Sequence, residues 1–323
     1  MMLTRSIVVN TFYQALGKFG SALCMFGATL LLARFLGGEM FGEFTTVVTY
    51  LSLFYMSVDL GLNQIYLHVA GNNAETHYAQ FFNLRLLLGV VVSLVAIGVM
   101  WVLTGLGANY TRLELWGVAI GVLMIPAYAL VLTTTAIFQN RRHFNLAAIA
   151  QGIGSFVTLL GILFWISISP SGVIGMLGGI VWWTIGTIVT SGLSIFYTHL
   201  KINLTAVNWR FWADLFKRSA SLALALLANH AYVRWGILSL SWYRPAIEVG
   251  QYGLAFKFFE VALSLPIFFM NSYYPDLLEM SVLEIGERAK KLIQTLFLGS
   301  LVVTGVLFVG APLLSLVRVD FAQ

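Results

Sequence analysis

Long apolar stretches recur along the chain, separated by short polar segments. About nine of them reach the roughly 20 residues that an α-helix needs to cross the hydrocarbon core of a bilayer. They lie at about 7–33, 44–69, 81–104, 115–138, 146–168, 174–197, 219–241, 250–274 and 292–317. Backbone polar groups in hydrocarbon must be satisfied within their own segment, so we expect helices. The pattern predicts an all-α polytopic membrane protein with about nine transmembrane helices.

The composition supports lipid as the surrounding solvent. Hydrophobic residues make up 59% of the 323 residues and charged residues only 10%, which is more apolar side chain than a globular protein of this length could bury. The first stretch contains Asn10, Gln14 and Lys18 and has no clear small-residue cleavage site. We therefore interpret it as a retained span rather than a signal peptide. Cys24, the single cysteine, excludes an intrachain disulfide.

Basic residues between the stretches are distributed unevenly over the two sides of the predicted membrane. The larger set is Arg5, Arg141, Arg142, Lys201, Arg210, Lys217, Arg218, Arg288, Lys290 and Lys291, and the smaller set is Arg34, Arg112, Arg244 and Arg318. This bias predicts a multi-pass protein of the inner (plasma) membrane with a cytoplasmic N-terminus. The basic residues form no tract interleaved with aromatics, which argues against a nucleic-acid partner.

The longest polar interruption, at about 198–218, divides roughly six spans from roughly three. Asn208 can cap a short helix there. One face of that helix carries Trp209, Trp212, Ala213 and Phe216. We expect an N-terminal six-helix bundle at 1–198, a cytoplasmic amphipathic linker helix at 199–218, and an incomplete C-terminal bundle of about three helices at 219–323.

The C-terminal part is too short to form a matching bundle. An amphipathic stretch at 276–291 is expected to lie flat on the cytoplasmic surface. Without further helices, the polar faces around Asn229, Arg234 and Lys257 would meet lipid. We therefore expect a fragment of a longer transporter, with a homo-oligomer or a partner subunit as the alternative.

Two runs share a pattern of apolar residue, glycine, polar residue and aromatic residue. Phe41-Gly42-Glu43-Phe44 opens the second span, and Val249-Gly250-Gln251-Tyr252 opens the eighth. The echo is typical of paired membrane bundles. The first run follows Leu31-Leu32-Ala33-Arg34-Phe35-Leu36-Gly37, and the second continues as Gly253-Leu254-Ala255-Phe256-Lys257 before Pro266 and Pro275. In these runs the chain resembles the polysaccharide and O-antigen flippases of the multidrug/oligosaccharidyl-lipid/polysaccharide exporter superfamily, over essentially its whole length.

The resemblance implies a cationic cavity between two bundles of comparable size. It also implies a lipid-linked oligosaccharide, a polyprenyl pyrophosphate sugar, as the substrate, with membrane lipids and a glycan polymerase as candidate partners. Two departures stand out: Arg234-Trp235-Gly236 occupies the place where members often carry an aspartate, and the chain stops just after its ninth span. No Gly-rich run ends in Gly-Lys-Ser/Thr, so we expect no bound nucleotide and no cofactor.

Charged side chains inside the predicted spans are few, namely Lys18, Asp59, Arg85, Arg234, Lys257 and Glu260. Each costs about 2.5–3.5 kcal/mol near a helix centre and should face a partner or a wet cavity. Lys257 and Glu260, three residues apart, can neutralise each other. Arg85 lies about a turn from the cytoplasmic end, where it can reach the interface or pair with Asp59. Lys18 and Arg234 have no partner nearby in sequence.

We expect the four cations to line one cavity and bind a pyrophosphate or an acidic sugar, because lysine and arginine can replace phosphate hydration. Further substrate contacts are expected among the polar residues Asn10, Gln14, Asn63, Gln64, Asn229 and His230, with interhelical hydrogen bonds as the alternative. Candidates for ion coupling are Asp59, Glu260 and His230, and the alternative for His230 is a hydrogen-bonded packing role.

The sequence favours a flippase that works by alternating access of two bundles. The alternative is a cation-coupled multidrug antiporter of the same superfamily, but intramembrane cations outnumber the acids that would attract its cargo. A membrane glycosyltransferase or ligase is less favoured, because the aspartates form no close pairs and no His/Cys spacing fits a metal. Those aspartates are Asp59, Asp214, Asp276 and Asp320. We expect a transporter and no enzymatic activity.

Overall fold

The computed structural model describes residues 2–70, 77–108, 110–141, 143–168, 172–201, 203–204 and 207–278, and short pieces between 293 and 308. Side chains are described at residue 17, at 19–69, within these ranges from residue 77 to residue 262, and in the short pieces between 293 and 308. Every element in the described ranges is a helix, which confirms the all-α class. The helices are α1 (Met2–Ser57), α2 (Leu62–Ala70), α3 (Tyr78–Gly105), α4 (Arg112–Gly121), α5 (Met124–Arg141), α6 (Phe144–Ile168), α7 (Val173–Thr198), α8 (Trp209–Tyr243) and α9 (Ala246–Leu278).

Five segments of the described chain are long and apolar enough to cross a membrane. They are Phe19–Val69, Tyr78–Gly105, Arg112–Arg141, Phe144–Ile168 and Val173–Thr198. The first of them takes in most of two expected spans, and the expected spans at 219–241 and 250–274 lie within α8 and α9. The amphipathic stretch at 276–291 lies almost entirely outside the described residues, and so does more than half of the ninth expected span at 292–317. The count of about nine therefore stays a prediction.

The first connection between spans is a kink rather than a loop. Residues 34–43 are helical except at Gly37, whose φ of 78° and ψ of 173° lie in a region that glycine enters at little cost. A second break follows Ser57, where Leu60 and Gly61 have φ of 46° and 66° and separate α1 from α2. The second expected span is therefore built from the last part of α1 and from α2.

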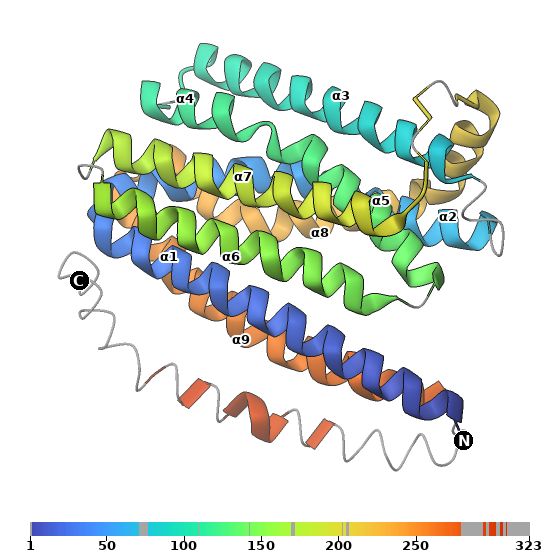
Figure 1. Ribbon diagram of the computed structural model, residues 1–323. Coiled ribbons are helices and arrows are strands. Elements are labelled where there is room, and N and C mark those ends of the chain that lie inside the picture. The colour runs from blue at the N-terminus through green and yellow to red at the C-terminus, as the bar shows by residue number, and fades with distance from the viewer. Residues whose placement is uncertain are drawn as a thin grey trace.

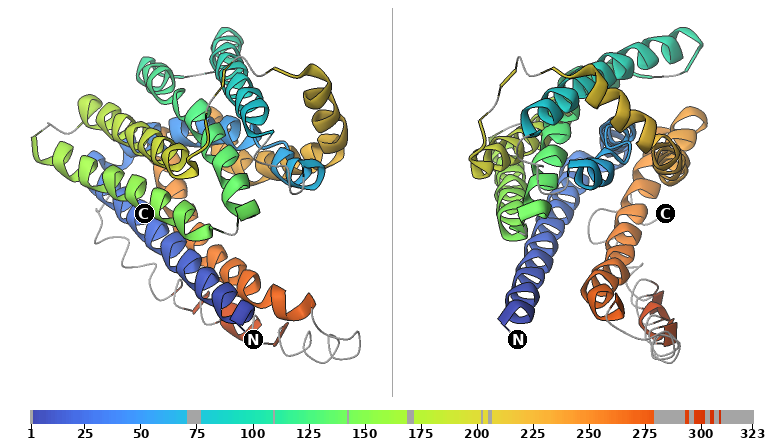
Figure 2. Two further views of the ribbon diagram at one scale, coloured as in Figure 1. Left: turned by 45° about the vertical axis from the view of Figure 1, so that its right-hand side comes forward. Right: turned by 90° about the vertical axis from the view of Figure 1, so that its right-hand side faces the viewer.

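α1 is the central helix of the protein. It packs along α6 and α9, while α7 lies against α5 and α6 (Figure 1). The views of Figures 1 and 2 agree in placing α3 and α4 on one side of α1 and α9 on the other. The main core joins α1 to α5, α7, α8 and α9 through buried Leu32, Val47, Leu51, Ile125, Ile180, Leu238 and Leu254.

Two ends of the bundle are named here for later use. The outer end holds the kink at Gly37, the turn between α3 and α4, and the turn between α8 and α9. The inner end holds α2, the α5–α6 turn and the start of α8 (Figure 1). The positive-inside topology predicts that the outer end faces the outside of the cell.

The predicted linker helix forms the first turns of α8. The side chain of Asn208 accepts a hydrogen bond from Phe211 N at 3.1 Å, as an N-cap should. The docked face consists of Trp212 and Leu215, which pack into a core at the inner end with α2 and α3. Trp212 Nε1 also donates to the Gln80 carbonyl at 3.0 Å. Trp212 of the expected apolar face is therefore buried, whereas Trp209 of the same face is 70% exposed, and the placement of this face at the membrane interface stays a prediction.

Candidate functional site

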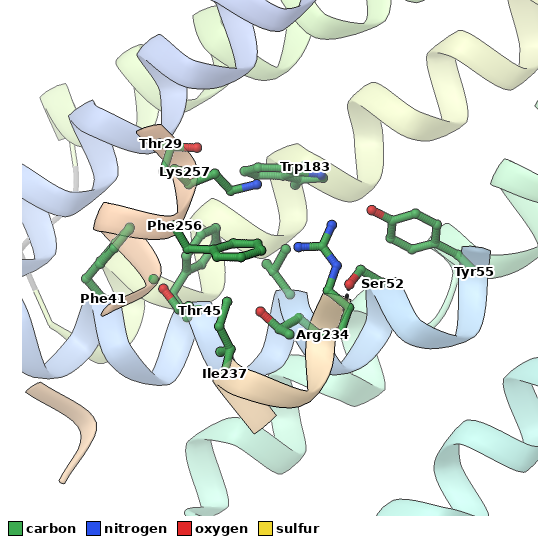
Figure 3. Close-up of a pocket in the computed structure, with 14 residues that line it drawn as sticks. Thr29, Phe41, Thr45, Ser52, Tyr55, Trp183, Arg234, Ile237, Phe256 and Lys257 are labelled. Atoms are coloured by element: carbon green, nitrogen blue, oxygen red, sulfur yellow. Dashed lines mark hydrogen bonds between the residues drawn. The ribbon is translucent and has the colours of Figure 1, made fainter. Parts of the chain in front are cut away.

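A pocket of about 500 Å³ lies between α1, α7, α8 and α9. We call it the central pocket. Its cations are Arg234 from α8 and Lys257 from α9. Figure 3 shows the charged ends of both side chains pointing towards the Trp183 ring. The rest of the wall is mostly hydroxyl and aromatic, and includes Thr29, Thr45, Thr49, Ser52, Tyr55, Trp183 and Phe256. The structure thus brings two of the four predicted cations together, from helices adjacent in sequence.

Glu260 holds both cations of the central pocket. Its carboxylate accepts from Arg234 at 2.6 Å and from Lys257 at 2.7 Å. The Lys257–Glu260 ion pair was predicted from their spacing of three residues. For Arg234 the sequence offered no nearby partner, and the structure shows that its partner is Glu260 on the next helix. The Nε of Arg234 is buried and donates to no described group. Two positive charges against one negative charge leave the trio with one excess positive charge.

Arg85 and Asp59 form a separate network towards the inner end. The Arg85 side chain is 0% exposed and lies 3.0 Å from Asp59 Oδ1. It donates also to Asn63 Oδ1 at 2.6 Å and to the backbone carbonyls of Val58 and Asp59. The Phe81 ring lies 5.2 Å from its guanidinium carbon. Arg85 is therefore enclosed by its own partners, outside the walls of the central pocket.

The other predicted residues are spread over the structure. Lys18, Asn10 and Gln14 lie on α1, but their side chains are outside the described part. Asn229 and Gln64 are exposed, and His230 is half-buried on α8. Asn63 donates to the Leu132 carbonyl at 3.0 Å, so it makes the interhelical hydrogen bond weighed as the alternative to a sugar contact.

A larger pocket of about 1070 Å³, the hydroxyl pocket, lies within α1, α5, α6 and α7. Tyr55 and Trp183 line both it and the central pocket. Its serine and threonine hydroxyl groups donate to carbonyls of their own helices, so their lone pairs remain as acceptors. The groups are Thr135, Ser155, Thr158, Thr187 and Thr190.

The sequence analysis did not single out the hydroxyl residues that line the two pockets. One signal was available: Thr45, Thr49 and Ser52 have the spacing i, i+4, i+7, which places them on one helix face. All three line the central pocket. The hydroxyl pocket collects residues from three further helices, and two of them show the same spacing, with Gln151, Ser155 and Thr158 on α6 and Trp183, Thr187 and Thr190 on α7.

The outer end is closed by close contacts between α1 and the α8–α9 region. A methyl group at Gly42 would overlap the Ala246 carbonyl oxygen, and one at Gly250 would lie 2.5 Å from the Gly38 carbonyl oxygen. Trp242 Nε1 donates to the Tyr110 hydroxyl at 2.7 Å across the same end. Gly42 and Gly250 are the equivalent glycines of the two echoing runs, and a methyl group at Gly250 would lie 3.1 Å from the backbone nitrogen of Gly42.

The fold is that of a multi-helix membrane transporter. A multidrug resistance MATE family transporter of the MOP superfamily, solved in an inward-facing conformation, is similar with a TM-score of 0.72 and 14% identity, covering 94% of this chain and 73% of the other. A MOP superfamily transporter from Pyrococcus furiosus Vc1, described as having a binding pocket of reverse polarity, has a TM-score of 0.57 and 14% identity, covering 98% and 76%. A search of curated protein sequences finds no match.

The family follows from the sequence match. The model of the polysaccharide biosynthesis protein family matches residues 7–281, and the chain belongs to that family. Together with the transporter fold, this membership makes the protein a membrane transporter of the flippase or exporter type. The resemblance inferred from the two glycine runs is confirmed.

Proposed function

We propose that the protein moves an anionic lipid-linked oligosaccharide across the plasma membrane, with the pyrophosphate in the central pocket and without a catalytic step. The observation that carries the proposal is Arg234, which lines the pocket beside Lys257 and shares the single carboxylate of Glu260 with it. Guanidinium and ammonium groups are strong hydrogen-bond donors to phosphate oxygens. The excess positive charge of the trio attracts an anion in this poorly solvated place.

The sugar part has a complementary surface in the hydroxyl pocket. Its acceptor oxygens suit the hydroxyl groups of a glycan, and Tyr55 and Trp183 offer aromatic faces between the two pockets. Asn10 and Asn229 are proposed to contact the substrate in other stages of the cycle. Lys18 is proposed to add its charge from α1, and Glu260 and His230 are proposed to take part in ion coupling.

The transport cycle is proposed to be alternating access between an N-terminal bundle at 1–198 and a C-terminal bundle that begins at 219, joined by the linker at 199–218. The closed outer end, with the Trp242–Tyr110 hydrogen bond at 2.7 Å, supports an inward-open state. A glycan polymerase is proposed as the downstream partner, because polymerisation would remove the delivered substrate.

Replacing Arg234 with alanine is expected to reduce transport of a labelled polyprenyl-pyrophosphate oligosaccharide in proteoliposomes about tenfold to a hundredfold. The change removes one cation and lets Glu260 neutralise Lys257, and a hydrogen bond to a charged group contributes about 1.5–3 kcal/mol. The matched control is Arg218→Ala on the same helix, an exposed arginine paired with Asp214. Wild-type transport by Arg234→Ala would contradict the proposed anion site.

The same vesicles distinguish the drug-antiporter alternative. Transport of a cationic dye that survives Arg234→Ala but is lost in Glu260→Gln would favour an antiporter, because an acid would then attract the cargo. Glu260→Gln is expected instead to leave oligosaccharide binding in place, since it raises the positive charge of the central pocket.

The proposed topology predicts opposite labelling of two exposed leucines. In a cysteine-free background made by Cys24→Ser, Leu106→Cys should react with a membrane-impermeant maleimide added outside whole cells. Leu204→Cys should react only after the membrane is opened. The side chains are 80% and 65% exposed, so burial does not prevent labelling at either position. The reverse pattern would contradict a cytoplasmic N-terminus.

A further inference from the structure

Two glutamates meet in a pocket at the outer end that the transport site does not use. This outer pocket, of about 850 Å³, is lined by Glu43 from α1 and Glu114 from α4. Its opposite wall is the end of α8 and the start of α9, from Ser241 to Ala246, with Val249. The outer pocket therefore lies between α1 and α4 on one side and the α8–α9 turn on the other. These two sides must separate when the outer end opens.

Both carboxylates are almost completely enclosed. Glu43 is 7% exposed and Glu114 is 6% exposed. Glu114 closes a capping box, in which its Oε2 accepts from Thr111 N at 2.9 Å and its own N donates to the Thr111 hydroxyl at 3.1 Å. Thr111 also bonds the Glu43 side chain. The Oε2 atom of Glu43 is buried and has no hydrogen-bond partner in the part of the chain that the structure describes.

The charged and titratable groups around the pair leave it without a counter-charge among the described residues. On α1, Glu39 adds repulsion to Glu43. On α4, Arg112 is exposed, and Glu43 and Glu114 repel each other. On the opposite wall, Arg244 is paired with Glu248 at 3.1 Å, and Tyr243 is exposed. Burial raises the pKa of Tyr110, so this phenol stays neutral at physiological pH.

Two ionised carboxylates in such an enclosed place cannot coexist cheaply. Each buried charge without a partner costs several kcal/mol, and their mutual repulsion is strong in a poorly polarisable surrounding. Binding of one proton removes the mutual repulsion and one of the two buried charges, and on Glu43 it makes the unpartnered oxygen a neutral carboxyl oxygen or a donor. The described residues contain no cluster of three or more His, Cys, Asp or Glu that could hold a metal ion.

We propose that Glu43 and Glu114 form a proton-binding site whose occupation closes the outer end of the transporter. When the α8–α9 turn moves away from α1 and α4, the carboxyl pair meets the external solution and exchanges its proton. When the turn returns, Trp242 donates its hydrogen bond to the Tyr110 hydroxyl and the Gly42–Ala246 contact forms. Glu43 and Glu114 are then enclosed again. Closure therefore takes up a proton, and external acid favours the closed outer end.

The test is a spin-label distance across the outer end, measured without substrate in nanodiscs. Labels at Leu106 and Tyr243, 80% and 82% exposed, in a Cys24→Ser background report the separation of α3 from α8. In the otherwise unchanged protein, the closed population is expected to rise as the pH falls, by up to about tenfold per pH unit for one linked proton. The double variant Glu43→Gln/Glu114→Gln is expected to stay closed at every pH.

The variants are matched for structure and charge. Glutamine is isosteric with glutamate and keeps the capping box of Thr111. Glu39→Gln and Glu248→Gln remove a carboxylate from the same end but should keep the pH response. A pH response that persists in the double variant, or its absence from the unsubstituted protein, would overturn the proposal. So would closure at alkaline pH by sodium chloride but not by choline chloride, because the site would then bind a metal cation.

Discussion

Gly42→Leu is expected to abolish transport by holding the outer end open. Even a methyl group at this position would overlap the Ala246 carbonyl oxygen, and the neighbouring Gly250 packs equally close to Gly38. Both partners are backbone atoms, which cannot rotate away as a flexible side chain can. Overpacking costs about 1–3 kcal/mol, and more where the obstacle is backbone. A cost of about 3 kcal/mol in the closed state lowers the ratio of closed to open molecules about a hundredfold.

The measurement combines transport with the distance between labels at Leu106 and Tyr243. Gly42→Leu should show background transport and a longer mean distance at every pH. Gly98→Leu is the control, because Gly98 lies on α3 with open space around it and the same side chain meets no obstacle. Equal transport by the two variants would mean that the Gly42 contact is not needed for the cycle.

Asp59→Ala is expected to destabilise the protein by about 3–5 kcal/mol, because it leaves Arg85 buried without its counter-charge. Arg85 is 0% exposed, so water cannot replace the lost carboxylate. Its hydrogen bonds to Asn63 and to the Val58 and Asp59 carbonyls would remain, but they carry no full negative charge. In detergent, the variant should aggregate at a lower temperature than the unsubstituted protein. Size-exclusion chromatography of heated samples measures this temperature.

A double variant separates the buried charge from the lost contacts. Arg85→Met/Asp59→Ala removes both charges, and its melting temperature should recover much of the loss because no unpaired ion remains. The control Asp214→Ala breaks the exposed pair with Arg218 and should change stability by less than about 1 kcal/mol. If the double variant were as unstable as Asp59→Ala, the cost would come from packing and not from charge.

The sequence by itself determined the class of protein and the identity of several important residues. Apolar runs of about 20 residues require helices in lipid, and this local constraint does not depend on how the helices pack. The cap at Asn208 was readable for the same reason, since the side chain bonds an amide three residues away. The two glycine runs also indicated the family, which the match over residues 7–281 confirms.

The pairing of side chains on different helices was decided by the tertiary structure. Arg234 and Glu260 are 26 residues apart and meet only because α8 and α9 pack with particular rotations. The kink at Gly37 replaced an expected loop, because one glycine with positive φ suffices to redirect the helix. The hydroxyl pocket and the Glu43–Glu114 pair each draw on two or more helices. Hydropathy measures what a segment buries, whereas helix rotation and crossing decide which polar groups face each other.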